Sequence, residues 1–228
     1  MIAKSDEQIK QEVLRELKMD TRVDDAEIGV VVTKGVVTLM GSTAGYVKKL
    51  AAQEAAHRVA GVRDVANDIK VKVPGSLART DTEIAQAVRR ALEWDVLVPD
   101  DLIQSTVADG WVTLEGTVEL LRERDDAERA IRHLAGVRGV INKIGAAGNR
   151  VDADRVRRQI EEALERRAQR EVQHMEITVK EGEVTVAGKV DSWSEKQAVL
   201  GVVGHIPGVC AVHDSLQIDP YTKAPTRC

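Results

Sequence analysis

The pentapeptide Gly35-Val36-Val37-Thr38-Leu39 returns as Gly110-Trp111-Val112-Thr113-Leu114 and again as Gly182-Glu183-Val184-Thr185-Val186. Two more glycines accompany each copy, so nine glycines repeat at spacings of 75 and then 72 residues: Gly35, Gly41, Gly61, Gly110, Gly116, Gly136, Gly182, Gly188 and Gly208. A fixed period of this kind indicates tandem copies of one structural unit. We therefore expect three small domains, at residues 1–74, 75–148 and 149–219, followed by a polar tail at 220–228.

The residues around the pentapeptide predict two helices and three strands in every copy. Apolar residues recur every fourth position from Ile9 to Leu17, which predicts a helix, and alternate from Ile28 to Val32, which predicts a half-buried strand. Gly35 supplies the positive φ of a tight turn into the second strand, and a second helix and a third alternating strand follow. The order α-β-β-α-β predicts an α+β fold in which two helices cover one face of a three-stranded sheet. The other face is then open for a neighbour or a ligand.

The composition argues against several classes of function. Of the residues, 43% are hydrophobic and only 2% aromatic, so the cores are aliphatic and stacking platforms for bases are scarce. The net charge of −4 gives no basic field for nucleic acid, and no nucleic-acid partner is expected. No phosphate-binding loop, zinc-protease motif or serine-hydrolase motif occurs, and the five histidines occupy different repeat positions. We therefore predict no catalytic residues, no metal ligands and no cofactor, and expect that the protein is not an enzyme.

A second glycine motif completes a resemblance to a known family. It stands as Gly61-Val62-Arg63-Asp64-Val65, as Gly136-Val137-Arg138-Gly139-Val140 and as Gly208-Val209-Cys210-Ala211-Val212. Together with the pentapeptide, these segments resemble the BON domain, in three copies over nearly the whole chain. Asn67 and Asn142 match the family's asparagine-bearing last strand, whereas the third copy departs from it with Asp214.

The resemblance implies a non-catalytic module that attaches to phospholipid surfaces, often in proteins raised under osmotic or other stress. Most relatives are exported, but neither a secretory segment nor an apolar run of about 20 residues is visible here, so we expect a cytoplasmic protein, peripheral at the inner membrane face. Two alternatives stay open. A related cytoplasmic family joins one such domain to a LysM domain and binds potassium, and an interaction scaffold for other proteins is the third possibility.

Aromatic residues supply the candidate contacts of this chain. An indole suits the headgroup layer of a membrane, which makes all three tryptophans candidate anchors: Trp94, Trp111 and Trp193. Trp193 shares its repeat position with Tyr46 and Leu121, which predicts ordinary packing where the second helix starts. Trp111 stands in the hairpin strand and is expected to point outward, so it is the candidate contact with a partner.

Charged residues supply the remaining candidates. The first helix of the third copy carries candidate headgroup contacts on its outer side, namely Arg155, Arg158 and Arg166. Glu162 is four residues from two of them, and this spacing favours ion pairs within a solvated helix face. The carboxylate pairs Asp24-Asp25 and Asp100-Asp101 could contribute to a site for a hard cation, but turn chemistry is the favoured explanation, partly because the third copy has no matching pair.

Overall fold

A computed structural model describes residues 4–23, 28–147, 153–167 and 175–219. The first unit contains α1 (Asp6–Met19), β1 (Ile28–Thr33), β2 (Val36–Thr43), α2 (Tyr46–His57) and β3 (Asp64–Val71). The second contains α3 (Asp81–Trp94), β4 (Ile103–Ala108), β5 (Trp111–Val118), α4 (Leu121–Ile131) and β6 (Gly139–Ala146). The third contains α5 (Ala153–Arg167), β7 (Met175–Lys180), β8 (Glu183–Val190), α6 (Trp193–Gly204) and β9 (Ala211–Ile218). Two single-turn helices, η2 (Gly75–Leu77) and η3 (Asp100–Leu102), flank α3. The predicted order α-β-β-α-β is confirmed in all three units.

Each unit has its own mixed sheet. The first two strands form an antiparallel hairpin, and the third strand pairs in parallel with the second, which is therefore central. The hairpin turn has positive φ at Lys34 and Gly35, 52° and 79°, which is the backbone twist that a two-residue hairpin needs. The second helix is the crossover that allows the parallel pairing.

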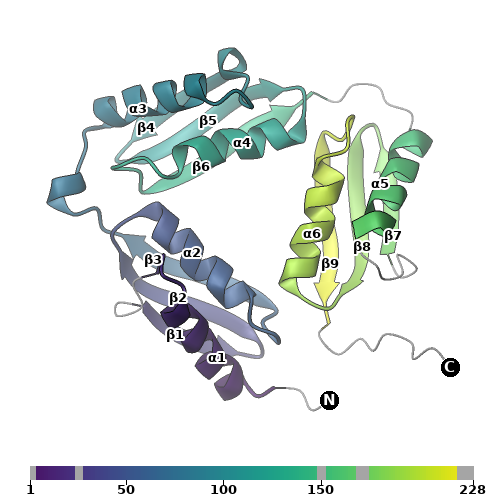
Figure 1. Cartoon of the computed structure of the whole chain (residues 1–228), viewed down its shortest axis with the longest axis horizontal. Helices are drawn as coiled ribbons and strands as arrows, with labels where there is room; N and C mark the ends of the chain where they lie inside the picture. Colours follow the sequence, from purple (N-terminus) through teal and green to yellow (C-terminus); the bar gives the residue numbers. More distant parts are fainter. Residues whose placement is uncertain (1–3, 24–27, 148–152, 168–174, 220–228) are drawn as a thin grey trace.

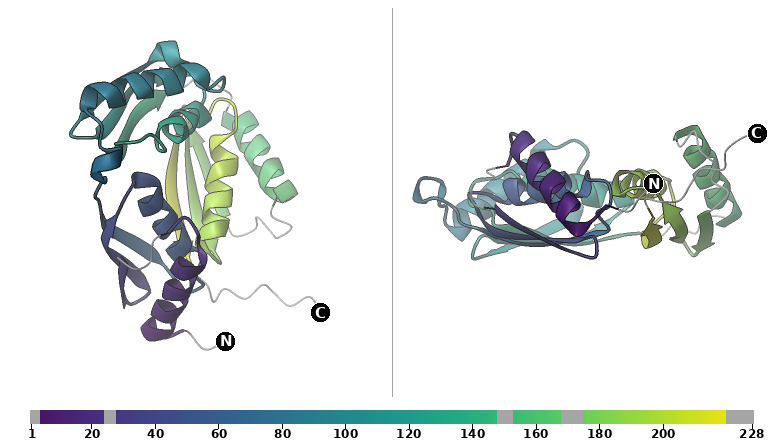
Figure 2. Two further views of the ribbon diagram at one scale, coloured as in Figure 1. Left: turned by 60° about the vertical axis from the view of Figure 1, so that its left-hand side comes forward. Right: turned by 90° about the horizontal axis from the view of Figure 1, so that it is seen from below.

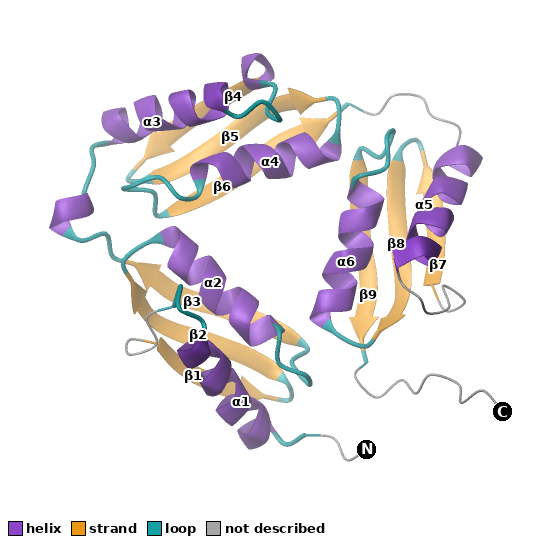
Figure 3. Ribbon diagram, viewed as in Figure 1, coloured by secondary structure: helices purple, strands orange, loops and turns teal. Residues whose placement is uncertain are grey.

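Both helices of a unit pack on the same face of its sheet (Figure 3). In the first unit, Val13 on α1 is fully buried against the inward residues Val37 and Leu39 of β2. Alternate residues of the same strand, such as Val36 and Met40, are exposed on the other face. The expected arrangement of two helices over a sheet with an uncovered second face is thus present. The described residues form three separate apolar cores, one in each unit.

The three units are arranged as a triangle (Figure 1). The second helices α2, α4 and α6 lie on its inner side, and the first helices α1, α3 and α5 lie on its outer side. The right-hand view of Figure 2 shows the sheets of the first two units below their helices, so their uncovered faces turn to the same side.

Candidate functional site

The two most exposed large apolar residues of the described chain lie together in the second unit, at the end of α3 and in the turn that follows it. Trp94 ends α3 and is 85% exposed, and Val96 and Leu97 in the following turn are 96% and 56% exposed. We call these three residues the apolar tip. Asp95 shapes the turn, because its carbonyl oxygen accepts from Val98 N at 3.0 Å and its carboxylate accepts from Leu97 N at 3.0 Å. The structure therefore holds three large apolar side chains in water at a defined place.

Such a turn normally carries other residues. Turn positions favour Gly, Pro, Asn, Asp and Ser, which solvate well and tolerate the required backbone angles. Here the chain places Val96 and Leu97 at the centre of the turn and buries the next residue, Val98, in the core of the second unit. Burial of Val98 anchors the turn, so the tip cannot fold back without exposing a core residue. Exposed apolar side chains grouped in this way mark contact surfaces.

The charges around the apolar tip are mostly acidic. Arg89 forms an ion pair with Glu93 at 2.9 Å and a second one with Asp100. Asp95 and Asp101 are further carboxylates of the same loop and of η3. Carboxylates thus outnumber the two nearby basic side chains, Arg89 and Arg90, and the tip has no lysine- and arginine-rich border of the kind by which a surface recognises anionic lipid. Asp100, one of the carboxylates suggested for a cation, is already held by Arg89, and its counterpart pair Asp24-Asp25 lies outside the described residues.

A second apolar patch lies on the uncovered sheet face of the same unit. Trp111 is 46% exposed, and its ring covers Gly139 on the neighbouring strand, where a β-carbon would lie 2.3 Å from the indole Cζ3. Ile141 is exposed diagonally across from it. Glu115 and Lys143, one row further along the sheet, form an ion pair at 3.1 Å. This face combines a flat aromatic side chain with satisfied charges.

The uncovered faces differ from one unit to the next. In the first unit, Val31 lies diagonally between Val36 and Met40, and all three are exposed. In the third unit, the corresponding surface is polar, with Glu183 beside His213 at 3.2 Å. An apolar sheet surface is therefore a property of the first two units.

The arginines suggested as headgroup contacts are only partly described. Arg155 and Arg158 are exposed on α5. Arg155 also lines a shallow hollow with Glu119 of the second unit and Pro207 of its own. Arg166 lies in the last turn of α5, where the side chains are outside the described residues. Among the described part of α5, the ion pair joins Arg157 and Glu161 at 2.9 Å, and none joins Arg158 to Glu162.

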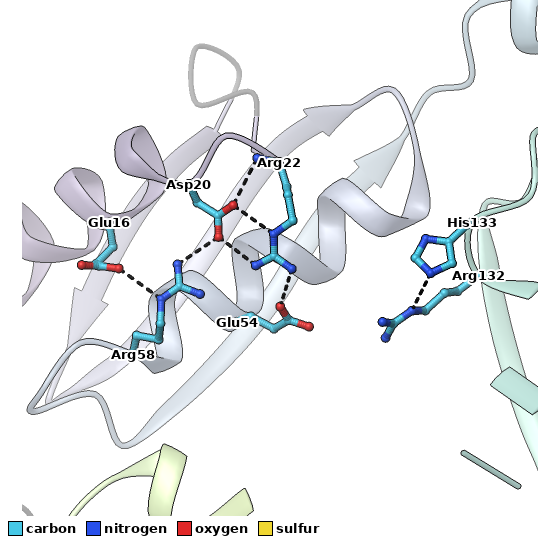
Figure 4. Close-up of polar contacts among 7 residues, drawn as sticks. All are labelled: Glu16, Asp20, Arg22, Glu54, Arg58, Arg132 and His133. Atoms are coloured by element: carbon cyan, nitrogen blue, oxygen red, sulfur yellow. Dashed lines mark hydrogen bonds and ion pairs between the residues drawn. The ribbon is translucent and has the colours of Figure 1, made fainter. Parts of the chain in front are cut away.

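The densest cluster of charges in the first unit has a structural role (Figure 4). Asp20 is nearly buried and accepts hydrogen bonds from Arg22 and Arg58, with ion-pair distances of 2.8 and 2.9 Å. The hydrogen bond from Arg22 and the one from Arg58 hold the pKa of this carboxyl well below its usual range. The two arginines continue to Glu54 at 2.9 Å and Glu16 at 3.2 Å. The cluster ties the end of α1 to α2 and leaves the carboxylate saturated with donors. The separate pair in Figure 4, Arg132 and His133, lies in the second unit.

Comparison with known families matches this architecture. A model of the BON domain matches residues 5–73, 80–147 and 152–220. The chain belongs to the BON domain family. This family consists of non-catalytic binding domains associated with phospholipids.

Other comparisons add less. No curated protein matches the chain. Two solved structures of CdsD, a structural protein of the type III secretion system of Chlamydia trachomatis, are similar at 12% identity. One, its C-terminal domain, has a TM-score of 0.26, with 92% of this chain and 96% of that chain covered. The other has a TM-score of 0.28, with 93% and 92% covered.

The repeat pattern does not predict the apolar tip as a unit. Of its three residues, only Trp94 is a candidate contact from the sequence, as one of the three tryptophans, and Val96 and Leu97 are not candidates. A sequence signal for the tip exists: two aliphatic residues between Asp95 and Pro99 stand where a turn is expected to be polar.

Over the described ranges, no helix has both the length and the apolar character needed to cross a bilayer, and no group of three or more potential metal ligands is found there.

Proposed function

We propose that the protein is a peripheral phospholipid-binding protein whose second BON domain inserts the apolar tip into the membrane surface. The observation that carries the proposal is the exposure of Trp94, Val96 and Leu97 in a turn anchored by buried Val98. Trp94 suits the headgroup layer and the two aliphatic side chains suit the acyl region below it. The family's association with phospholipids supports the same function.

The size of the tip determines how strongly it binds. Full burial of one aliphatic side chain is worth about 1.5–3 kcal/mol, and a tip at the interface is only partly inserted. A share of about 2 kcal/mol for Trp94 corresponds to roughly 30-fold in vesicle affinity. Binding that depends on three side chains is therefore reversible, as expected of a peripheral protein.

The acidic surroundings of the tip determine which lipid is preferred. Because Glu93, Asp95 and Asp101 lie near the tip, anionic headgroups are repelled rather than attracted. We expect binding to zwitterionic phosphatidylcholine vesicles, with no gain when phosphatidylglycerol is added. Added salt screens the repulsion, so binding to the anionic vesicles should rise with salt.

Vesicle flotation tests the proposal with a matched pair of variants. Trp94→Ala removes the indole of the tip, and Trp111→Ala removes the indole on the sheet face of the same domain. We expect the first variant to lose roughly 30-fold in affinity and the second to bind like the wild type. If Trp94→Ala with Val96→Ser and Leu97→Ser floats as well as the wild type, the tip is not the contact and the proposal fails.

A second candidate function rests on the uncovered sheet face around Trp111. On this face, the indole of Trp111 lies near exposed Ile141 and near the ion pair of Glu115 and Lys143. Such a surface resembles a contact between proteins, where aromatic residues are enriched. We therefore propose this face as the contact for a protein partner. Loss of a captured partner in Trp111→Ala but not in Trp94→Ala would support it, and the reverse result would contradict it. A stress role, potassium binding and a cytoplasmic location stay predictions from the sequence.

A further inference from the structure

One position of the repeat leaves its own domain in all three copies. Tyr46, Leu121 and Trp193 each begin the second helix of their domain. Tyr46 packs against the core of the second domain, and Leu121 packs against the core of the third. Trp193 stacks on His57 of the first domain. The sequence predicts ordinary packing at the start of the second helix; the three side chains do pack there, but against another domain. We call Tyr46, Leu121 and Trp193 the joint residues.

The surface that receives a joint residue is also the same in each domain. Trp193 lies on His57, and Leu121 lies beside Gly204, where a β-carbon would be 3.6 Å from its Cδ2. Burial, and then the nearby carboxylate of Glu128, raises the pKa of Tyr46, whereas the backbone of Val140 and the charge of Arg132 oppose that rise. The residues at the end of the second helix that receive these contacts are His57, Arg132 and Gly204, and they occupy one position of the repeat. We call them the receiving residues.

The helices consequently follow one another around the triangle. The start of α2 meets the end of α4, the start of α4 meets the end of α6, and the start of α6 meets the end of α2 (Figure 1). A head-to-tail contact repeated with a rotation either closes into a ring or continues into a filament. Here the third contact returns to the first domain, so the same contact made three times closes the triangle.

The closing contact is the one that no linker accompanies. The rings of Trp193 and His57 are 3.7 Å apart at their centroids, with an angle of 6° between their planes. His57 is only 6% exposed. Lys196 Nζ lies 5.6 Å from the centre of the Trp193 ring, within the range of a cation–π interaction. Of the three joint residues, the one without a linker thus has the largest side chain.

We propose that Trp193 and His57 close this chain into a ring of three domains in solution. The receiving surface of the first domain is then occupied by the third domain of the same chain. The two linkers hold these domains at high effective concentration, which favours closure within one chain over pairing with a second copy.

Trp193 fluorescence reports on this contact in the full chain. In a Trp94→Phe and Trp111→Phe background, Trp193 is the only tryptophan. His57 is far away in the sequence, so His57→Ala changes the Trp193 signal only if the two rings meet. We expect a shift of the emission to longer wavelength and stronger quenching by acrylamide. His133→Ala, an exposed histidine in the second domain, is the matched control and should change neither.

Three results decide against the proposal. The first is an unchanged Trp193 signal in His57→Ala that retains the wild-type circular dichroism. The second is a His57 effect that appears only as the protein concentration rises, which shows a contact between chains. If His57→Ala does not fold, the contact is tested instead by small-angle X-ray scattering on the Trp193→Ser variant. We expect this variant to have a larger maximum particle dimension than the wild type. A maximum dimension equal to that of the wild type is the third contrary result.

Discussion

A carboxylate at the start of the first helix holds the hairpin turn in two of the three domains. Asp6 accepts hydrogen bonds from the backbone N–H groups of Lys34 and Gly35, at 2.7 and 2.9 Å. Asp81 makes the same two contacts with the turn of the second domain, both at 2.9 Å. The third domain has Ala153 at this position, although its turn has the same positive φ angles. The effect of the carboxylate on the turn can therefore be compared between the first two domains, which have it at this position, and the third, which does not.

Removing and adding the carboxylate should shift local stability in opposite directions. Each hydrogen bond to a charged group is worth about 1.5–3 kcal/mol net, and solvent at this half-exposed site reduces that value. We expect Asp6→Ala to cost about 2 kcal/mol and Ala153→Asp to add about 1 kcal/mol to the third domain, since a new side chain must also lose rotamer freedom. Glu7→Ala removes a neighbouring charge from the same helix turn, so it controls for the helix dipole.

Hydrogen exchange is the suitable assay because three linked domains do not unfold in one step. The amides of Lys34 and Gly35 should exchange roughly 30-fold faster in Asp6→Ala and nearly normally in Glu7→Ala. The amides of Glu181 and Gly182 should exchange more slowly in Ala153→Asp. If Asp6→Ala and Glu7→Ala speed exchange equally, the effect is one of charge at the helix start, and the reasoning from two directed hydrogen bonds is wrong.

Three further predictions concern pH and one glycine. Asp20→Asn should lower the stability of the first domain by about 2 kcal/mol at neutral pH, measured by urea unfolding followed by NMR. Because the hydrogen bond from Arg22 depresses the pKa of Asp20, the wild-type carboxylate makes its full contribution to stability above about pH 4. That contribution is lost as the pH falls through the pKa of Asp20 in the folded state. Burial lowers the pKa of His57 to about 4; the charge of Asp64 opposes this shift and that of Lys196 adds to it, so the closed ring favours the neutral imidazole. The Trp193 signal should therefore report full closure above about pH 6.5 and progressive opening as the pH falls toward 4. Gly139→Ala should displace the Trp111 ring and shift its emission to longer wavelength with little change in the unfolding midpoint, because the ring lies on the surface; an unchanged emission would contradict the close approach.

The fold could be predicted because one pattern is written three times. A single alternating segment such as Ile28 to Val32 does not by itself establish a strand. The same alternation beside the same glycine in three copies predicts a strand at this position of the repeat. Local chemistry even survives a change of residue. Asn142 donates from Nδ2 to Arg124 O at 2.8 Å, whereas the third copy has Asp214, which forms an ion pair with Lys196 at 2.6 Å. All three copies have a basic residue at this helix position, Lys49, Arg124 and Lys196, so the carboxylate of Asp214 meets a side chain that can pair with it.

The candidate sites could not be predicted in the same way, because they depend on what surrounds each side chain. Periodicity assigns a residue to the inner or outer face of its own domain, but it does not say whether another domain covers it. Trp193 and Trp94 illustrate the difference: both are tryptophans at helix ends, yet one stacks on His57 and the other is 85% exposed. Only the arrangement of the domains separates the two.

Variation between copies at one repeat position then becomes informative about function. Positions that hold the fold keep their residue type, as with the inward residues Val37, Val112 and Val184. The joint position instead changes from Tyr46 to Leu121 to Trp193, because each side chain meets a different receiving residue. Such variation distinguishes the three contacts from one another, which a ring built from similar domains requires if each domain is to meet only its proper neighbour. Exchanging Tyr46 and Trp193 should therefore weaken closure, seen as a larger maximum dimension in scattering, although the chain keeps the same composition. An exchange that leaves the dimension unchanged would show that either aromatic side chain suffices at both joints, and that the match between joint residue and receiving residue does not hold the ring together.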